Sequence, residues 1–335
     1  MSYRGSAIEG VHVLAVWLTG FGGPEVLVAR ASPDPVPEDG QVVVDVEYAN
    51  ITFVETQFRA GLPGPFRGAT LPLVPGNGVG GIVAAVGPDV DPALVGTRVI
   101  TSTGGSGGYA ERVAVAAELV IPVPSEVPMD VAVALLADGR TATMLTAAAG
   151  PRPGERVLVE AAAGGVGSLL VQLAKDAGAR VVAAVGGPRK VEVARDLGAD
   201  DVVDYLVPGW ASRVGAVDVV FDGVGGEIGT SAFWLLGRGG RMVSFGLASG
   251  EWADVPAAEA TRRGVTLVRA SGTPEQLRAF TVDALATAAA GRLHPLIGQR
   301  FPLARAADAH AAIESRATVG KTLLVVGTKY QGDRK

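Results

Sequence analysis

The chain is 335 residues long, with 48% hydrophobic and 19% charged residues, which is enough apolar material for two domains and argues against disorder. Its 34 acidic residues outnumber 29 basic ones, and the resulting formal net charge of −5 argues against a nucleic-acid partner. It has no cysteine and no uninterrupted apolar stretch of about 18 residues, so we expect a cytoplasmic protein without disulfides, thiolate metal sites or a membrane partner.

The first 130 residues are expected to form a mostly β domain. Short apolar runs separated by glycine and proline are typical of strands in such a domain. These runs lie at 11–18, 26–29, 41–48, 81–86, 98–102, 109–115 and 119–122.

Beyond residue 129 the pattern changes, because helical runs alternate with apolar strands. The predicted strands lie at 156–159, 180–185, 201–204, 217–222, 241–245 and 265–268. This alternation predicts an α/β fold with a doubly wound parallel six-stranded sheet. A helix at 274–290, a strand at 299–302, a helix at 304–315 and a strand at 322–326 follow. We expect this last part to return to the first domain, so that residues 1–130 and 272–335 form one domain and residues 131–271 the other.

Residues 156–185, RVLVEAAAGGVGSLLVQLAKDAGARVVAAV, predict a strand, a tight turn, a helix and a second parallel strand. Such a unit holds the pyrophosphate of a dinucleotide, because glycines admit the phosphates and the helix N-terminus presents amide donors. Gly164 is expected to allow that approach, and Gly167 to let the helix pack against the strand. The expected cofactor-binding residues of the turn are Ala163, Gly164, Gly165, Val166 and Gly167.

The end of the second strand indicates which dinucleotide binds. NAD-binding proteins place Asp or Glu there to accept from the ribose 2′-hydroxyl. Here the segment is VGGPRK (185–190), with no carboxylate and with two cations. Cations favour the 2′-phosphate of NADPH, so we expect Lys190 to contact it. Gly187, in the same segment, is expected to bind the cofactor. The alternative is that Arg189 and Lys190 are only solvated at a helix start, where cations are unfavourable unless an anion is present.

The chain carries eight motifs that share one family resemblance. They are GFGGPEVL (20–27), PGNGVGGIVAAVG (75–87), GGYAERV (107–113), AAAGGVGSLLVQLAKDAGA (161–179), RKVEVARDLGAD (189–200), VVFDGVGG (219–226), MVSFG (242–246) and ESRATVGKTLLV (314–325). They resemble the zinc-independent quinone oxidoreductase branch of the medium-chain dehydrogenase/reductase superfamily, which includes zeta-crystallin-like proteins.

This resemblance implies a GroES-like β domain, a Rossmann domain, an active-site cleft between them and usually a homodimer. It implies hydride transfer from NADPH to a quinone or an α,β-unsaturated carbonyl compound, with the protein orienting and polarising the substrate. It places Lys190, Tyr205 and Arg316 at the phosphate end of NADPH. The residues that it places near the hydride are Thr52, Gln57, Arg59, Tyr109, Thr141 and Phe245; Thr141, Phe245 and Gly246 are also expected to bind the cofactor.

The sequence gives little support for a metal site. At the positions where zinc-dependent relatives have a cysteine and a histidine, this chain has Thr52 and Asn77. Its three histidines, His12, His294 and His310, are scattered and lack carboxylate spacing. We therefore expect a metal-independent protein.

The catalytic motif departs from the family pattern, approximately N-x-x-D-x-Y-x-R-x-G. Thr52 stands at the family asparagine and Gln57 at the tyrosine, and an amide cannot act as a phenolic acid. Three hypotheses therefore remain open. The first is a quinone or enone reductase, the second an enoyl reductase for a biosynthetic polyketide or acyl thioester intermediate, and the third an NADPH-binding sensor or interaction protein with little turnover.

Overall fold

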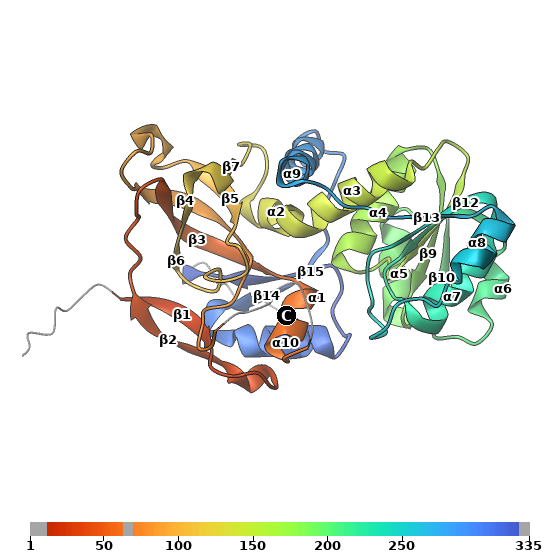
Figure 1. Cartoon of the computed structure of the whole chain (residues 1–335), viewed down its shortest axis with the longest axis horizontal. Helices are drawn as coiled ribbons and strands as arrows, with labels where there is room; N and C mark the ends of the chain where they lie inside the picture. Colours follow the sequence, from red (N-terminus) through yellow and green to blue (C-terminus); the bar gives the residue numbers. More distant parts are fainter. Residues whose placement is uncertain (1–11, 63–69, 328–335) are drawn as a thin grey trace, which may run out of the picture.

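The structure is a computed structural model that describes residues 12–62 and 70–327, and its strands form three β-sheets of two, six and seven strands (Figure 1). The two-stranded sheet pairs β1 (His12–Leu18) with β2 (Leu27–Pro33). The predicted strand at 11–18 begins at Val11, which lies outside the described residues, so β1 is described from His12.

The seven-stranded sheet joins segments that are far apart in the chain. Its strand β3 (Gln41–Ile51) pairs with β4, β6 and β15. The order β14-β15-β3-β4-β5-β7 shows that two C-terminal strands lie in the same sheet as β3, β4, β5 and β7. The other elements here are β4 (Gly78–Val86), β5 (Arg98–Ser102), β6 (Arg112–Ala116), β7 (Ile121–Pro122), β14 (Ile297–Pro302), α10 (Ala306–Glu314) and β15 (Lys321–Val325).

The six-stranded sheet is parallel throughout, in the order β10-β9-β8-β11-β12-β13. Val157 and Leu158 of β8 lie in different apolar clusters, the first with α4 and α5 and the second with α6, α7 and α8. Helices therefore cover both faces, which confirms the doubly wound prediction. The elements are β8 (Arg156–Glu160), α4 (Gly165–Asp176), β9 (Arg180–Val185), α5 (Pro188–Asp196), β10 (Asp201–Asp204), α6 (Trp210–Val214), β11 (Val217–Asp222), α7 (Gly226–Leu235), β12 (Leu236–Ser244), α8 (Ala257–Arg263) and β13 (Thr266–Val268).

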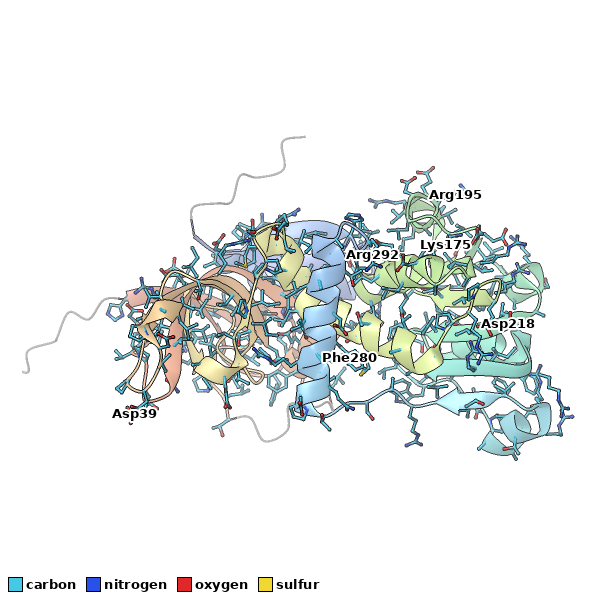
Figure 2. All side chains as sticks on the ribbon, turned by 90° about the horizontal axis from the view of Figure 1, so that it is seen from above. Asp39, Lys175, Arg195, Asp218, Phe280 and Arg292 are labelled. Atoms are coloured by element: carbon cyan, nitrogen blue, oxygen red, sulfur yellow. The ribbon has the colours of Figure 1, made fainter. Side chains whose placement is uncertain are left out.

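A long helical segment connects the two large sheets. It consists of α2 (Met129–Ala134), a π-helical turn (Leu135–Gly139) and α3 (Arg140–Ala149). The predicted domain boundary at residue 130 falls at the start of this segment. Helix α9 (Pro274–Ala289) packs against α3 and crosses the junction between the two halves, as the position of Phe280 in Figure 2 shows. Just beyond α9, Arg292 forms a 2.8 Å ion pair with Asp176 at the end of α4.

The segment Met129–Ala149 also has the length and apolar composition of a membrane span, with 44% of its most apolar window buried. The sequence does not predict a membrane span here, because the charged residues Asp130, Asp138 and Arg140 interrupt the apolar stretch. Its Leu135 and Leu145 are 0% and 1% exposed and belong to the core. Packing between the sheets therefore explains why this segment is apolar.

Most predicted strands agree with the structure to within a few residues. The strand predicted at 109–115 is shorter in the structure, since β6 begins at Arg112. The strand predicted at 241–245 corresponds to the end of the longer β12. The short helix α1 (Phe53–Arg59) was not predicted. Single 3-10 turns lie at Pro24–Val26, Pro92–Leu94, Ala117–Leu119 and Leu303–Arg305.

Candidate functional site

The glycine-rich turn after β8 leads directly into α4. Gly164 is the N-cap, and the helix begins at Gly165. A Cβ on Gly167 would lie 2.3 Å from the carbonyl oxygen of Ala161, so only glycine allows α4 to approach the turn this closely. A Cβ on Gly165 would lie 2.0 Å from Oδ2 of Asp138. Because α4 follows β8 directly, its N-terminus lies at the carboxyl end of that strand, the edge of a parallel sheet where dinucleotides bind.

The start of β15 lies against this turn. The Gly320 amide donates to the carbonyl of Ala163 at 2.7 Å, and Gly164 and Gly320 form a parallel bridge. Gly320 has a φ of +58°, and a Cβ there would lie 2.0 Å from the Leu296 carbonyl oxygen. The seven-stranded sheet is thereby tied to the dinucleotide turn, a contact that the sequence did not predict.

Three residues expected at the phosphate end lie together. The Lys190 ammonium donates to the carbonyl of Arg316 at 2.9 Å, and the Arg316 guanidinium donates to the carbonyl of Ala248. Burial, with the nearby Arg316 charge, lowers the pKa of Lys190. Burial also raises the pKa of Tyr205 to about 12, although the nearby Arg316 charge opposes this rise. Neither cation has a carboxylate partner within residues 12–62 and 70–327.

The turn before α5 is shaped by glycine and by an acid from the next strand. Gly187 has a φ of +100°, which favours glycine, and its amide donates to Oδ1 of Asp204 at 2.9 Å. A Cβ on Gly186 would lie 2.8 Å from the Tyr205 hydroxyl oxygen. Asp204 ends β10, not β9, so sequence reasoning about the second strand missed it.

The ends of β8, β11 and β12 complete this edge of the sheet. Asp222 accepts from the Gly225 amide at 2.7 Å and from the Ser244 hydroxyl at 2.8 Å. Glu160 is 0% exposed and lies against Asp222, close enough for the two acids to share a hydrogen bond. Burial, followed by the negative charge of Asp222, raises the pKa of Glu160 well above its usual range. The sequence analysis did not identify this acid.

Phe245 and Gly246 follow β12 at the same edge. The amide of Phe245 donates to the carbonyl of Asp222 at 2.9 Å, and a Cβ on Gly246 would lie 2.6 Å from the Gly223 carbonyl oxygen. Thr141 lies in the first turn of α3, where its hydroxyl donates to the carbonyl of Ala137 at 2.7 Å. The π-helical turn directly precedes α3, and such distortions are frequent at functional sites.

Helix α1 carries the altered catalytic motif. Thr52 is its half-buried N-cap, and Glu55, one turn later, is 3% exposed. The amide and the hydroxyl of Thr52 both donate to Oε2 of Glu55, at 2.6 and 2.8 Å. Gln57 is half-buried on the side of α1 that carries Phe53, and no side-chain hydrogen bond is found for it in the described structure. The Arg316 guanidinium lies over the ring of Phe53, with its central carbon Cζ 4.4 Å from the ring centre.

A buried ion pair lies between α1 and the dinucleotide turn. Nζ of Lys321, the first residue of β15, lies 2.9 Å from Oδ1 of Asp138 in the π-helical turn. Their side chains are 4% and 13% exposed. The Lys321 charge also lowers the pKa of Glu55, against the larger effect of burial, which raises it. The sequence signalled neither Asp138 nor Lys321 as a functional residue.

The placement of Tyr109 near the hydride was wrong. Tyr109 is 0% exposed in the core of the β domain, and its hydroxyl oxygen lies 2.9 Å from Nε2 of His310. Arg59 also differs from expectation, because it is 1% exposed and binds the Gly22 carbonyl and the Glu314 carboxylate. Both side chains are buried within the β domain.

Residues 12–62 and 70–327 contain no group of three or more His, Cys, Asp or Glu side chains that could hold a metal ion. The backbone amide of Asn77 donates to Oε1 of Glu55 at 2.9 Å, and the side-chain Oδ1 of Asn77 accepts from the Ser102 hydroxyl. Metal independence of the protein stays a prediction.

Comparison with known proteins agrees with this geometry. The chain matches an alcohol dehydrogenase GroES-like domain over residues 38–125 and a zinc-binding dehydrogenase domain over residues 197–324. With the doubly wound sheet and the glycine-rich turn, these matches define a medium-chain dehydrogenase/reductase. A quinone oxidoreductase of Pseudomonas aeruginosa is 34% identical over 91% of this chain and 97% of its own length. The chain therefore belongs to the zeta-crystallin-like quinone oxidoreductases of that superfamily.

Two further relatives cover almost the same length. A 2-haloacrylate reductase of a Burkholderia species is 30% identical over 93% of this chain and 99% of its own length. The solved structure of Escherichia coli quinone oxidoreductase complexed with NADPH matches with a TM-score of 0.84 and 30% identity, covering 93% of this chain and 99% of that chain.

Proposed function

We propose that the chain is an NADPH-dependent oxidoreductase that reduces a quinone or an α,β-unsaturated carbonyl compound. The observation that carries this proposal is the cluster of Lys190, Tyr205 and Arg316 beside the dinucleotide turn. The half-buried Lys190 ammonium and the exposed Arg316 guanidinium have no carboxylate partner among the described residues, and together they fit a dianionic 2′-phosphate, which NADH lacks.

The relatives support both halves of the proposal. The Escherichia coli protein is complexed with NADPH, and the Pseudomonas aeruginosa protein is a quinone oxidoreductase. The Burkholderia protein is a reductase of 2-haloacrylate, an α,β-unsaturated acid. These names favour turnover over a role as a sensor or interaction protein.

The residues present fit the cofactor. The α4 N-terminus and the turn Ala163–Gly167 would hold its pyrophosphate, and Lys190, Tyr205 and Arg316 its 2′-phosphate. Gly187, Phe245, Gly246 and Thr141 would line the remainder of its path. When bound, NADPH supplies a hydride from its nicotinamide ring. The chain's own task is then to orient the acceptor beside that ring and to stabilise charge on the acceptor oxygen.

We further propose a homodimer and a cytoplasmic location. Strand β13 is the edge of the six-stranded sheet, and its Leu267 is 40% exposed, so the edge is open to pairing with a second copy. Light scattering on the purified protein tests this: the mass of one chain at micromolar concentration contradicts the dimer.

Turnover is tested by following the loss of NADPH absorbance with quinones, enones and an enoyl thioester. We expect turnover with at least one quinone or enone. Turnover confined to the enoyl thioester would move the assignment to the biosynthetic alternative. Tight NADPH binding without turnover of any acceptor would favour the sensor.

A further inference from the structure

Reduction of a carbonyl compound by hydride requires a proton as well. Negative charge develops on the acceptor oxygen, and a nearby acid stabilises it. Most polar side chains expected here cannot be that acid. The Gln57 amide does not ionise usefully, the Tyr109 hydroxyl is buried against His310, and the Thr141 hydroxyl is bonded to a backbone carbonyl.

Thr52 and Glu55 differ from these residues, because they combine a reachable hydroxyl with a titratable proton. The hydroxyl oxygen of half-buried Thr52 lies 2.8 Å from Oε2 of Glu55, a distance that suits a hydrogen bond in either direction. The carboxyl itself is 3% exposed, so a substrate reaches Glu55 only through Thr52.

The groups around Glu55 come from four segments. The Thr52 amide and the Asn77 amide hold its two oxygens, at 2.6 and 2.9 Å. Lys321 of β15 is the charged group that faces it, and Tyr109, just before β6, is the titratable one. Burial is the largest influence and raises the pKa of Glu55, against the hydrogen bonds and the Lys321 charge.

The pair lies where the two halves of the molecule meet. Phe53, next to Thr52, contacts Arg316, which binds the carbonyl of Ala248 beyond β12. Lys321 reaches Asp138, which lies against Gly165 at the start of α4. Figure 1 shows α1 and β15 on the side of the β domain that faces the six-stranded sheet. The Thr52 hydroxyl is thus beside the path from the phosphate turn into the β domain.

The protonation of Glu55 decides what Thr52 offers to a substrate. An ionised carboxylate only accepts hydrogen bonds, so Thr52 must donate to it and presents lone pairs to the cleft. A neutral carboxyl donates its proton to the Thr52 oxygen, and the Thr52 hydroxyl is then free to donate to a carbonyl. Only the second arrangement stabilises a developing oxyanion.

We propose that Glu55 supplies, through the hydroxyl of Thr52, the proton taken up by the acceptor oxygen during reduction. This inference rests on the proposed function. For an enone, the hydride forms a C–H bond at the β-carbon, and the π electrons move to the carbonyl oxygen. That oxygen takes the Thr52 proton, Thr52 takes the Glu55 proton, and Glu55 later recovers one from water. The enol then becomes the saturated ketone, so the net transfer is one hydride, which carries two electrons, and one proton. Thr52 is the catalytic residue, and Glu55 is a positioning residue that acts through it.

Removal of the hydroxyl tests the first link. Thr52→Val should lower kcat at least tenfold with NADPH affinity unchanged, whereas Thr52→Ser should retain turnover. Thr56→Val is the matched control, since Thr56 lies on the same helix at 1% exposure and its hydroxyl donates to the Phe53 carbonyl. It should keep wild-type kcat. Equal kcat in wild type and Thr52→Val overturns the proposal.

Glu55→Gln tests the second link. The wild-type rate should fall as pH rises through the pKa of Glu55, because the proton is then absent, and Glu55→Gln should lack this limb. A retained limb overturns the proposal. Infrared difference spectra of wild type against Glu55→Gln, without any acceptor, should show a protonated carboxyl that titrates over the same pH range. A Glu55 that is ionised throughout that range refutes the relay even if no acceptor is turned over, whereas missing turnover alone refutes only the proposed function.

Discussion

His310 is a buried imidazole whose surroundings disfavour its protonation. Its ring is 1% exposed in α10, Nε2 faces the Tyr109 hydroxyl, and Nδ1 has no partner in the described chain. Burial, with the nearby Arg59 charge, lowers its pKa to about 3. The ring is therefore neutral in the folded state, and in acid it takes up a proton when the protein unfolds.

We expect this histidine to make the protein sensitive to acid. The ordinary pKa is 6.5 and the folded value about 3, so the unfolded chain binds more protons between these values. The free energy of unfolding should therefore fall as pH drops through this window, by about 2 kcal/mol at pH 5, and level off below it. Urea unfolding at pH 7 and pH 5 should show a smaller loss for His310→Gln. His294→Gln, which alters an exposed ring, should keep the wild-type loss, and an equal loss in all three proteins would contradict this assignment.

At the phosphate end, Lys190 should control the choice of cofactor. We expect NADPH to bind at least tenfold more tightly than NADH, a difference of about 1.4 kcal/mol. Lys190→Ala should remove most of that preference, because its ammonium lies with Arg316 and is half-buried. Calorimetric dissociation constants for both cofactors measure this. Arg189→Ala is the matched control, since Arg189 is exposed. Equal affinities in the unmutated protein would contradict the whole assignment.

Among the elements, α4 depends most on close packing against a turn. Gly167 lies in its first turn with no space for a side chain, since the Ala161 carbonyl oxygen occupies that position. The packing aligns the helix N-terminus with the carboxyl ends of the strands. Displacement of α4 would therefore move the amides that are expected to hold the pyrophosphate.

Gly167→Ala should lower both NADPH affinity and stability. A Cβ 2.3 Å from a backbone oxygen must push α4 outward, at a cost of roughly 1–3 kcal/mol by overpacking. Thermal unfolding with and without NADPH measures both effects. Gly237→Ala in β12 is the control, because its Cβ would meet only one atom, 3.9 Å away. A Gly167→Ala protein with wild-type melting temperature and affinity would show that α4 can shift freely.

On the scale of the whole molecule, the two halves share one apolar core. A single cluster extends from Ile100 and Leu323 of the seven-stranded sheet, through Leu135 and Leu145, to Val157 of the six-stranded sheet. The Asp138–Lys321 ion pair and the Gly320–Ala163 hydrogen bond cross the same junction. We infer that the two halves stabilise each other.

Removal of one partner from the buried pair should be costly. Lys321→Met leaves the Asp138 carboxylate buried without its cation and should lower the free energy of unfolding by about 3 kcal/mol. Adding Asp138→Asn should restore part of that loss, because no unpaired charge remains. Chemical unfolding of the single and double variants measures the coupling. Arg305→Met, which breaks an ion pair with side chains 61% and 52% exposed, should cost under about 1 kcal/mol. Additive losses in the double variant would contradict the coupling.

The sequence by itself determined the elements and the dinucleotide turn. Apolar periodicity, glycine and proline are local signals, and they placed β5, β9, β10 and β11 with the bounds that the structure shows. The segment VGGPRK indicated Lys190 as a phosphate contact, whereas Tyr205 and Arg316 were available only through the family resemblance. Tyr109 was misplaced by the same resemblance, because a motif position does not state which way a side chain points.

Tertiary structure alone decided which distant polar groups share an environment. Asp138, Glu160 and Lys321 lie in stretches that are ordinary by composition, and their burial follows from how the sheets and the helical segment Met129–Ala149 pack. One group that acts on Glu55 of α1 is Lys321, which lies at the start of β15, near the other end of the chain. Desolvation and Coulomb interactions depend on distance in space, so no local pattern predicts them. For that reason the sequence carried no signal for the Asp138–Lys321 ion pair or for the surroundings of Glu55.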